Sequence, residues 1–154
     1  MTYVVVRVRG TVNVNPDIKK TLQLMNLRKV NHCVLLEENP IEKGMLQIAK
    51  DYTTWGEIEK DILTKLIVSR GKLAGDKGLT DESLKSLTSY ADADKLAQAI
   101  IDNKYRYKDI PGVKPIFRLN PPKKGYRTIK RSFTRKGSLG YRGKEINKLI
   151  ERMI

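Results

Sequence analysis

The chain has 154 residues and carries 31 Lys and Arg against 17 Asp and Glu, which gives a formal net charge of +14. Hydrophobic residues make up 40% of it, enough for a folded core, which argues against disorder over the whole length. The charge predicts a polyanionic partner, either nucleic acid or an anionic membrane surface. Cys33 is the only cysteine and His32 the only histidine, which excludes an intrachain disulfide and a zinc finger.

No apolar stretch suits a membrane segment. A membrane-spanning helix needs roughly 18 consecutive apolar residues, and the early run from Val4 to Val6 is also too short for the hydrophobic region of a signal peptide. We therefore expect a cytoplasmic protein with no membrane partner. The length allows one domain, or a small core with an appendage.

The first elements are a strand and a helix. Residues 3–9 are rich in β-branched valine and predict a strand. Valine and arginine alternate at its end, so that Arg7 and Arg9 lie on the face opposite to the neighbouring valines. Asn15 and Pro16 are typical of the N-cap and the first turn of a helix. That helix would bury a stripe of apolar residues at helical spacing, formed by Ile18, Leu22 and Met25.

Two further strands and one helix complete the first unit. Residues 32–38 and 52–58 predict strands, and residues 41–50 between them predict a helix. The order β-α-β-α-β within residues 1–58 predicts the α+β class, with an antiparallel or mixed sheet and helices on one face. The other face of the sheet would then be open, with Arg7 on it. The apolar side of the second helix would consist of Ile41, Met45, Ile48 and Ala49.

The middle of the chain is predicted to be helical. Residues 57–68 and a segment that begins at Thr80 are typical of helices, and Asp92 is placed to cap a third helix that ends near Asp102. The near-balanced charge here indicates an extra packing layer for the first unit. Residues 115–119 predict a short edge strand. We expect three parts, namely a core domain at 1–58, a helical addition packed on it at 59–113, and a basic extension ending in a short helix at 114–154.

Most of the positive charge lies in the last quarter of the chain. Residues 114–154 hold 13 Lys and Arg against two Asp and Glu, a net of +11, whereas residues 1–113 hold 18 against 15. A glycine-punctuated block of one sign repels itself and cannot form a packed core alone, so we expect a partner to neutralise and order it. The alternative is a disordered basic tail that confers solubility. The densest part has no acid and seven basic residues, which are Lys123, Lys124, Arg127, Lys130, Arg131, Arg135 and Lys136.

No motif indicates catalysis. The stretch 71–77 lacks the spacing of the phosphate-binding loop in nucleotide hydrolases, and 137–143 does not match a dinucleotide fingerprint, although its glycines would let backbone approach a phosphate. Cys33 and His32 are adjacent in a strand and point to opposite faces, so they cannot act as a pair, and Cys33 is expected in the core. We expect no catalytic residue, metal site, cofactor or small-molecule substrate.

The aromatic residues have two interpretations. Trp55 is expected in the core, with stacking on a base as the alternative. Tyr105 and Tyr107 alternate with basic residues in a stripe that can contact nucleic acid. A long extension rich in Arg, Lys, Gly and Tyr suits crevices of folded RNA, and no helix-turn-helix for duplex DNA is evident.

Several strings resemble one protein family. The segments 21–32 (TLQLMNLRKVNH), 44–46 (GML) and 55–58 (WGEI) resemble the L-thirty family of large-subunit ribosomal proteins. The absence of a basic N-terminal extension favours the archaeal type. Three further segments resemble the longer archaeal form of this family and its eukaryotic relative, L-seven. They are 70–73 (RGKL), 115–125 (PIFRLNPPKKG) and 137–143 (GSLGYRG).

The resemblance implies a ferredoxin-like βαβαβ core with added helices, no catalysis, and a place in the large ribosomal subunit in the cytoplasm. The implied partners are large-subunit rRNA, near the small 5S-type rRNA, and neighbouring large-subunit ribosomal proteins. Carried over by matching motif, the implied RNA contacts are Lys20, Thr21, Arg28, Asn31, His32, Gly44 and Met45.

The residues themselves add RNA contacts near the C-terminus. Arg118, Arg142 and the seven basic residues from Lys123 to Lys136 are expected to bind phosphate, and Tyr126 and Tyr141 to stack on bases or sugars. The predicted function is a structural constituent of the large subunit that binds and stabilises folded rRNA. The alternatives are a free regulator that binds RNA or DNA, and a small enzyme on a ferredoxin-like scaffold. Fixed phosphate geometry is expected from Arg127, Arg131 and Arg135, because a guanidinium can bridge two oxygens.

Overall fold

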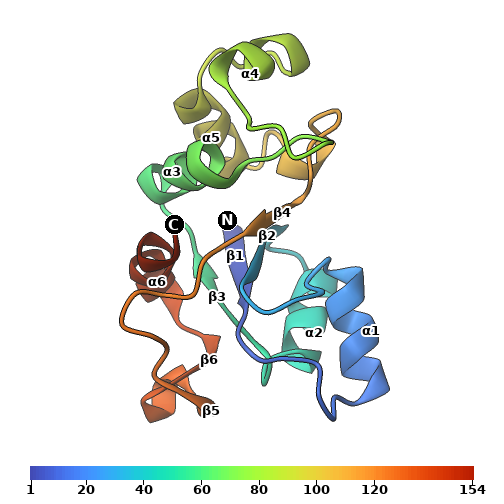
Figure 1. The fold of residues 1–154 in the computed structure, drawn as a ribbon, viewed down its shortest axis with the longest axis vertical. Helices are drawn as coiled ribbons and strands as arrows, with labels where there is room; N and C mark the ends of the chain where they lie inside the picture. The colour runs from blue at the N-terminus through green and yellow to red at the C-terminus, as the bar shows by residue number, and fades with distance from the viewer.

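The computed structural model describes residues 1–154 and shows one mixed sheet in the order β4-β2-β1-β3-β6-β5 (Figure 1). The central strand β1 is antiparallel to β2 and β3, and β4 is antiparallel to β2. The strand β6 is parallel to both β3 and β5. The strands are β1 (Thr2–Arg7), β2 (His32–Glu37), β3 (Thr53–Glu57), β4 (Ile116–Arg118), β5 (Thr128–Ser132) and β6 (Gly137–Tyr141).

Six helices connect and cover these strands, and three short 3-10 turns lie between them. The helices are α1 (Pro16–Leu24), α2 (Pro40–Ile48), α3 (Lys60–Arg70), α4 (Asp81–Leu87), α5 (Ala93–Ile101) and α6 (Ile146–Met153). The turns are η1 (Tyr107–Asp109), η2 (Phe133–Arg135) and η3 (Gly143–Glu145). The α+β class and the β-α-β-α-β order of the first unit are confirmed, and β4 is the predicted edge strand. None of the six helices is both long enough and apolar enough to cross a membrane.

Asparagine side chains cap the first two helices, and of these two caps the sequence predicts only Asn15. Asn15 Oδ1 accepts a 2.9 Å hydrogen bond from the Asp17 amide, and Asn39 Oδ1 accepts one of 2.8 Å from the Glu42 amide. Such bonds satisfy donors that the first helical turn leaves without a partner. Asp92 stands directly before α5 but makes no side-chain cap bond.

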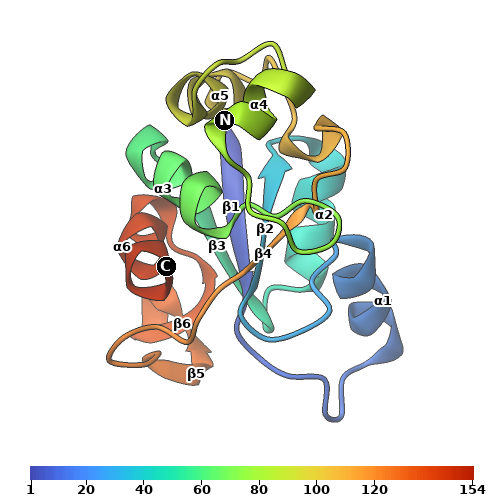
Figure 2. The same cartoon turned by 45° about the horizontal axis from the view of Figure 1, so that its top comes forward.

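Helices cover both faces of the sheet, so the prediction of an open face is wrong (Figure 2). On one face, Tyr3 and Val5 of β1 pack with buried residues of α1 and α2. On the other, Val4 and Val6 belong to the larger core, to which α3, α5 and α6 contribute. Arg7 therefore has no open face and is only 2% exposed, because its guanidinium bonds to the carbonyl oxygens of Leu27 and Arg9 at 2.7 and 2.9 Å.

The apolar stripe predicted for the second helix is also wrong in part. In α2 the buried residues are Leu46 and the C-cap Ala49, whereas Ile41 and Ile48 are 76% and 52% exposed. With about 3.6 residues per turn, positions two and five residues from Leu46 lie on the opposite side of the helix. Two isoleucines therefore remain on the surface.

The end of the basic range is built into the fold. Ile146, Leu149, Ile150 and Met153 form a buried stripe on α6 within the larger core, and β6 extends the sheet beside β3. An apolar stripe at helical spacing is enough to order this part despite its charge. Residues 123–136 carry the excess charge and yet form β5 beside β6, so the expectation that only a partner orders the range is wrong here. The division into three parts stays a prediction.

Candidate nucleic-acid interface

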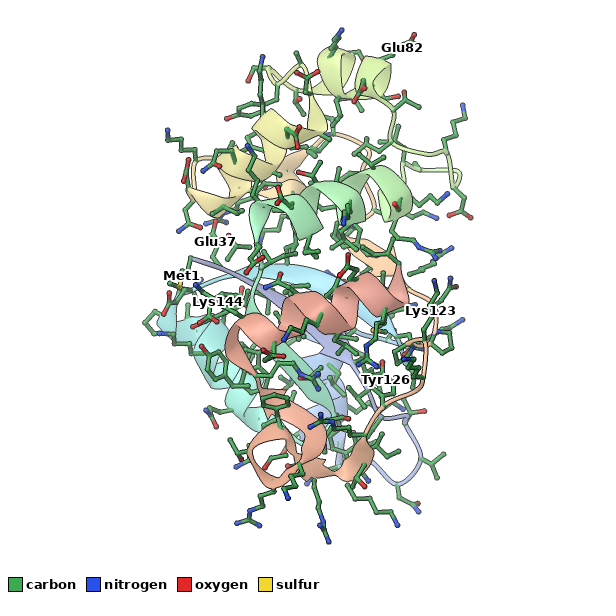
Figure 3. The ribbon with its side chains drawn as sticks, turned by 90° about the vertical axis from the view of Figure 1, so that its left-hand side faces the viewer. Met1, Glu37, Glu82, Lys123, Tyr126 and Lys144 are labelled. Atoms are coloured by element: carbon green, nitrogen blue, oxygen red, sulfur yellow. The ribbon has the colours of Figure 1, made fainter.

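The basic segment, residues 123–136, begins on the C-terminal end of α6. The Lys123 amide donates to the Arg152 carbonyl at 3.1 Å, and Arg152 Nη1 donates back to the carbonyls of Lys123 and Gly125 at 3.2 and 3.4 Å. Lys124 and Gly125 both have φ near +70°, at 67° and 71°, which reverses the chain direction. Figure 3 shows Lys123 and Tyr126 beside this end of the helix. The start of the segment is therefore fixed by the protein itself.

The rest of the segment faces solvent. In β5 the residues Thr128 to Arg131 are all exposed, and the seven basic side chains of the segment are exposed as well. None of the seven takes part in an intramolecular salt bridge, although seven such bridges exist elsewhere in the chain. Figure 3 shows nitrogen-tipped side chains projecting from the end of the molecule where β5 and β6 lie. This is a cationic surface with no internal compensation.

The glycines that follow differ in their surroundings. A Cβ on Gly137 would lie 2.0 Å from the Arg131 carbonyl oxygen, so only glycine lets β6 approach β5. Gly140 has φ +80°, a backbone conformation that side chains disfavour, and the space beside it is open. Gly137 therefore serves the packing of β6 on β5, whereas close approach of a phosphate to the stretch 137–143 stays a prediction.

Arg142 is held on several sides and fixes this surface to the sheet. Its Nε donates to Thr54 Oγ1 of β3 at 2.8 Å, and its Nη2 donates to the Ser138 carbonyl of β6, also at 2.8 Å. Its guanidinium carbon lies 5.0 Å from the Phe133 ring centroid. Burial lowers the pKa of Arg142 to about 10, so the group stays charged at neutral pH. A rigid cation thus joins β3, β6 and η2.

The structure brings part of the first predicted group of RNA contacts, Asn31 and His32, beside the C-terminal group. The Tyr126 hydroxyl donates to Asn31 Oδ1 at 2.7 Å, which ties the basic segment to the loop after α1. Directly beyond that loop, His32 of β2 is the register partner of Arg118 in β4. Residues 31–32, 118 and 126 are therefore neighbours, although they lie far apart in the sequence.

Other predicted residues lie apart from this group. Lys20 is exposed on α1, and Gly44 and Met45 are on α2, on the sheet face opposite to α6 (Figure 2). Thr21 is buried, and its hydroxyl donates to the Asp17 carbonyl at 2.9 Å, within its own helix.

Two predicted contacts are already paired with acids. Arg118 Nη1 lies 3.3 Å from Asp76 Oδ1, so part of its charge is balanced internally. The Tyr141 hydroxyl donates to Glu57 Oε1, and this bond raises the pKa of Tyr141 to about 12. Its ring is nevertheless 49% exposed and lies 6.5 Å, centroid to centroid, from that of Trp55. Tyr141 can therefore still offer a stacking face.

His32 and Cys33 are placed as predicted, with no common site. Cys33 is fully buried in the larger core, where burial raises the pKa of its thiol. His32 is half-buried, and burial together with Arg118 and Lys29 lowers the pKa of its imidazole. A neutral imidazole offers a hydrogen bond rather than a charge to RNA.

The aromatic residues of the middle region are mainly structural. Tyr107 is buried, and its ring centroid lies 4.8 Å from that of Phe117. Tyr105 is half-buried against Tyr90 at 5.6 Å. The stripe is therefore not an exposed stacking surface. Trp55 is buried, which confirms its placement in the core.

The structure adds basic residues that the sequence reasoning missed. A polar groove of about 470 Å³ lies between the basic segment and α6, and Lys148 and Arg152 line it with Arg127 and Arg142. The spacing of Lys148 and Arg152, four residues apart in a predicted helix, was the available signal. A second polar pocket, of about 310 Å³, is lined by Arg7, Thr11, Lys19, Gln23 and Arg28.

Comparisons with known proteins give one consistent similarity. The model of the family described as "Ribosomal protein L30p/L7e" matches residues 3–53. The chain is 47% identical over 151 residues to the large ribosomal subunit protein uL30 of Methanoculleus marisnigri, covering 98% of this chain and 99% of that protein. It is 47% identical over 152 residues to uL30 of Methanosphaera stadtmanae and 46% identical over 151 residues to uL30 of Archaeoglobus fulgidus, each over 98% or more of both chains.

Proposed function

The chain belongs to the ribosomal protein L30p/L7e family, and from this membership we propose that it is a structural constituent of the large ribosomal subunit that holds folded rRNA against its basic segment. The observation that carries the RNA contact is the set of seven exposed cations with no salt bridge in residues 123–136. Family membership also makes the chain a structural component rather than an enzyme, and the match to archaeal relatives over nearly its whole length assigns it to the archaeal type.

The binding mechanism follows from the charge and from the rigidity of its support. Each Lys or Arg that neutralises a phosphate releases a condensed counterion, so affinity falls steeply as salt rises. Arg127, Arg131 and Arg135 are placed to bridge phosphate oxygens in two-point contacts. Because α6 and Arg142 hold the segment, it loses less conformational entropy on binding than a disordered tail would.

The proposed contacts extend to the loop after α1. The Tyr126–Asn31 bond places Asn31 and His32 beside the basic segment, so one RNA region can contact both. The pocket at Lys19 and Arg28 supports a second contact, because both cations line it and are exposed. The proposal comprises Lys20, Thr21, Arg28, Asn31, His32, Gly44, Met45, Arg118, Lys123, Lys124, Tyr126, Arg127, Lys130, Arg131, Arg135, Lys136, Tyr141 and Arg142.

A finer part of the proposal concerns the neighbourhood in the subunit. Proximity to the 5S-type rRNA rests on the family resemblance alone, and crosslinks from the basic lysines to rRNA nucleotides would test it.

The main proposal is tested by sedimentation of ribosomes over a salt series. The protein should remain with large subunits at moderate salt and dissociate at high salt, and its recovery only in the unbound fraction at low salt would refute it.

A further inference from the structure

A partly apolar pocket of about 140 Å³ opens on the side of the molecule away from the basic segment. It lies where the end of α1, the strand β2 and the start of α2 meet the segment from Tyr105 to Lys108. Nine of its 17 lining residues are hydrophobic, among them Leu24, Leu36, Met45 and Ile100. A cavity near 150 Å³ is able to hold a group about the size of benzene. The pocket is therefore large enough for one side chain.

One carboxylate oxygen in this pocket, on Glu42, lacks a hydrogen-bond partner. Glu42 Oε2 is buried and accepts no hydrogen bond. Arg106 and Lys108 line the same pocket, but neither makes an ion pair with Glu42, and Arg106 is bonded instead to Glu37 Oε1 at 2.8 Å. Burial raises the pKa of the Glu42 carboxyl, as expected for a desolvated acid without a salt bridge. An unpaired acceptor of this kind is costly unless a donor arrives.

Exposed apolar side chains flank the opening. Leu24, which lines the pocket from α1, is 66% exposed. Ile41, Met45 and Ile48 follow the spacing of one helical face, and the two isoleucines are exposed. Helices of a protein with no partner normally bury such a face, so this surface suits contact with another chain.

The charge distinguishes this surface from the RNA-facing one. The pocket lining carries two acids, Glu37 and Glu42, and two bases, Arg106 and Lys108, so it is electrically balanced. Phosphates would approach two carboxylates here, whereas residues 123–136 contain no acid at all. A protein chain that carries a cation beside apolar groups satisfies both the carboxylate and the apolar wall.

We propose that this pocket receives a Lys or Arg side chain from a neighbouring large-subunit ribosomal protein, with flanking apolar residues of that protein on Leu24, Ile41 and Ile48. The partner's donor would bond to Glu42 Oε2, while its aliphatic stem packs against Leu36. This inference rests on the proposed function, since it takes the neighbour from the large subunit.

Photocrosslinking in assembled large subunits tests the proposal. The full-length chain is produced with p-benzoylphenylalanine in place of Ile41, and in a parallel arm in place of Lys130. Subunits are purified, irradiated, and the crosslinked peptide or nucleotide is identified by mass spectrometry. The Ile41 arm should yield a ribosomal-protein peptide with Lys or Arg beside apolar residues, and the Lys130 arm should yield rRNA.

The outcomes separate the two proposals. Crosslinks from position 41 to rRNA, to a second copy of the chain or to nothing would overturn the docking site while leaving the RNA result at position 130 intact. The proposed function would be overturned if position 130 gave no rRNA crosslinks and the protein did not sediment with large subunits. Adding Glu42→Gln, which keeps the side-chain shape, should lower the protein crosslink yield roughly tenfold, because a charged hydrogen bond is lost. The exposed Glu82→Gln on α4 is the matched control, and equal yields for the two variants would refute the role of Glu42.

Discussion

The Tyr126 hydroxyl donates a 2.7 Å hydrogen bond to Asn31 Oδ1 across 95 residues of sequence. Asn31 has φ +65°, a conformation that asparagine tolerates better than most residues, and its amide donates to the Arg7 carbonyl at 2.8 Å. The loop after α1 and the basic segment are therefore one structural unit. This contact gives Tyr126 a structural role, because its hydroxyl is occupied within the chain.

Tyr126→Phe tests that role. The variant keeps the ring but removes the donor to Asn31, so the free energy of unfolding should fall by about 1 kcal/mol. Denaturant unfolding measures this change, and Asn31→Ala in the same assay should cost more, because alanine tolerates φ +65° less well than asparagine. RNA affinity should change little if the ring alone contacts RNA. A large loss of affinity with unchanged stability would instead assign the hydroxyl to RNA.

The arginines of the basic segment should control the salt dependence of binding. Replacing Arg127, Arg131 and Arg135 with Ala removes about three phosphate contacts, so the slope of log K against log salt should flatten by about 3. Binding to a large-subunit rRNA fragment over a salt series measures it. The melting temperature should barely move, because these side chains make no salt bridge in the protein.

A charge-matched control separates local contacts from net charge. Replacing Lys60, Lys77 and Lys85 with Ala removes the same charge from exposed positions outside the basic segment. This control should leave the slope almost unchanged. Equal slopes for the two triple variants would place the phosphate contacts elsewhere.

Local signals in the sequence were enough to place most elements. The Asn15–Pro16 pair marks a helix start through a bond that spans two residues, so it does not depend on the remainder of the fold. The excess charge of residues 123–136 is equally local, since a run of cations without acids has no internal partner nearby. These features are readable because their causes lie within a few residues.

Features that depend on packing between distant segments could not be predicted from the sequence. Arg7 was expected on an open sheet face, but α1 and α2 cover it, and the carbonyl of Leu27 supplies a buried acceptor. The exposure of Ile41 and Ile48 depends on the rotation of α2 about its axis, which the position of Leu46 against the sheet decides. The Tyr126–Asn31 bond needs the complete fold. Contacts of this kind depend on which distant segments lie side by side in the fold, and the periodicity of the sequence does not indicate this.

His32 should titrate below its usual range. Burial, Arg118 and Lys29 lower the pKa of its imidazole from 6.5, so unfolding favours proton uptake. The contribution of His32 to stability is therefore complete above pH 6.5 and is lost as the pH falls through the lowered pKa of the folded state. As the only histidine, it gives one set of ring signals, which NMR can follow against pH.

An Arg118→Ala variant provides the control for that titration. Removal of the neighbouring cation should raise the pKa of His32 toward 6.5, while burial continues to lower it. A pKa for His32 at or above 6.5 in the intact protein would contradict the half-buried position of the ring near Arg118 and Lys29.

Arg142→Ala should destabilise the protein more than any change in the basic segment. It removes the bonds to Thr54 Oγ1 and the Ser138 carbonyl, which join β3 to β6, and it empties a half-buried site. Hydrogen bonds to charged groups contribute about 1.5–3 kcal/mol each, and the two are not additive, so we expect a loss of about 2–3 kcal/mol. Denaturant unfolding and the melting temperature both report it.

The comparison with Arg142→Lys shows which property of the side chain matters. Lysine keeps the charge but lacks the planar fork, so it cannot make both bonds in the same geometry, and stability should recover only in part. RNA affinity should fall with stability in this series, because Arg142 holds β3, β6 and η2 together as well as being a proposed phosphate contact. Full stability of Arg142→Ala, with a selective loss of RNA binding, would limit the guanidinium to the phosphate contact and leave the attachment of β6 to other bonds.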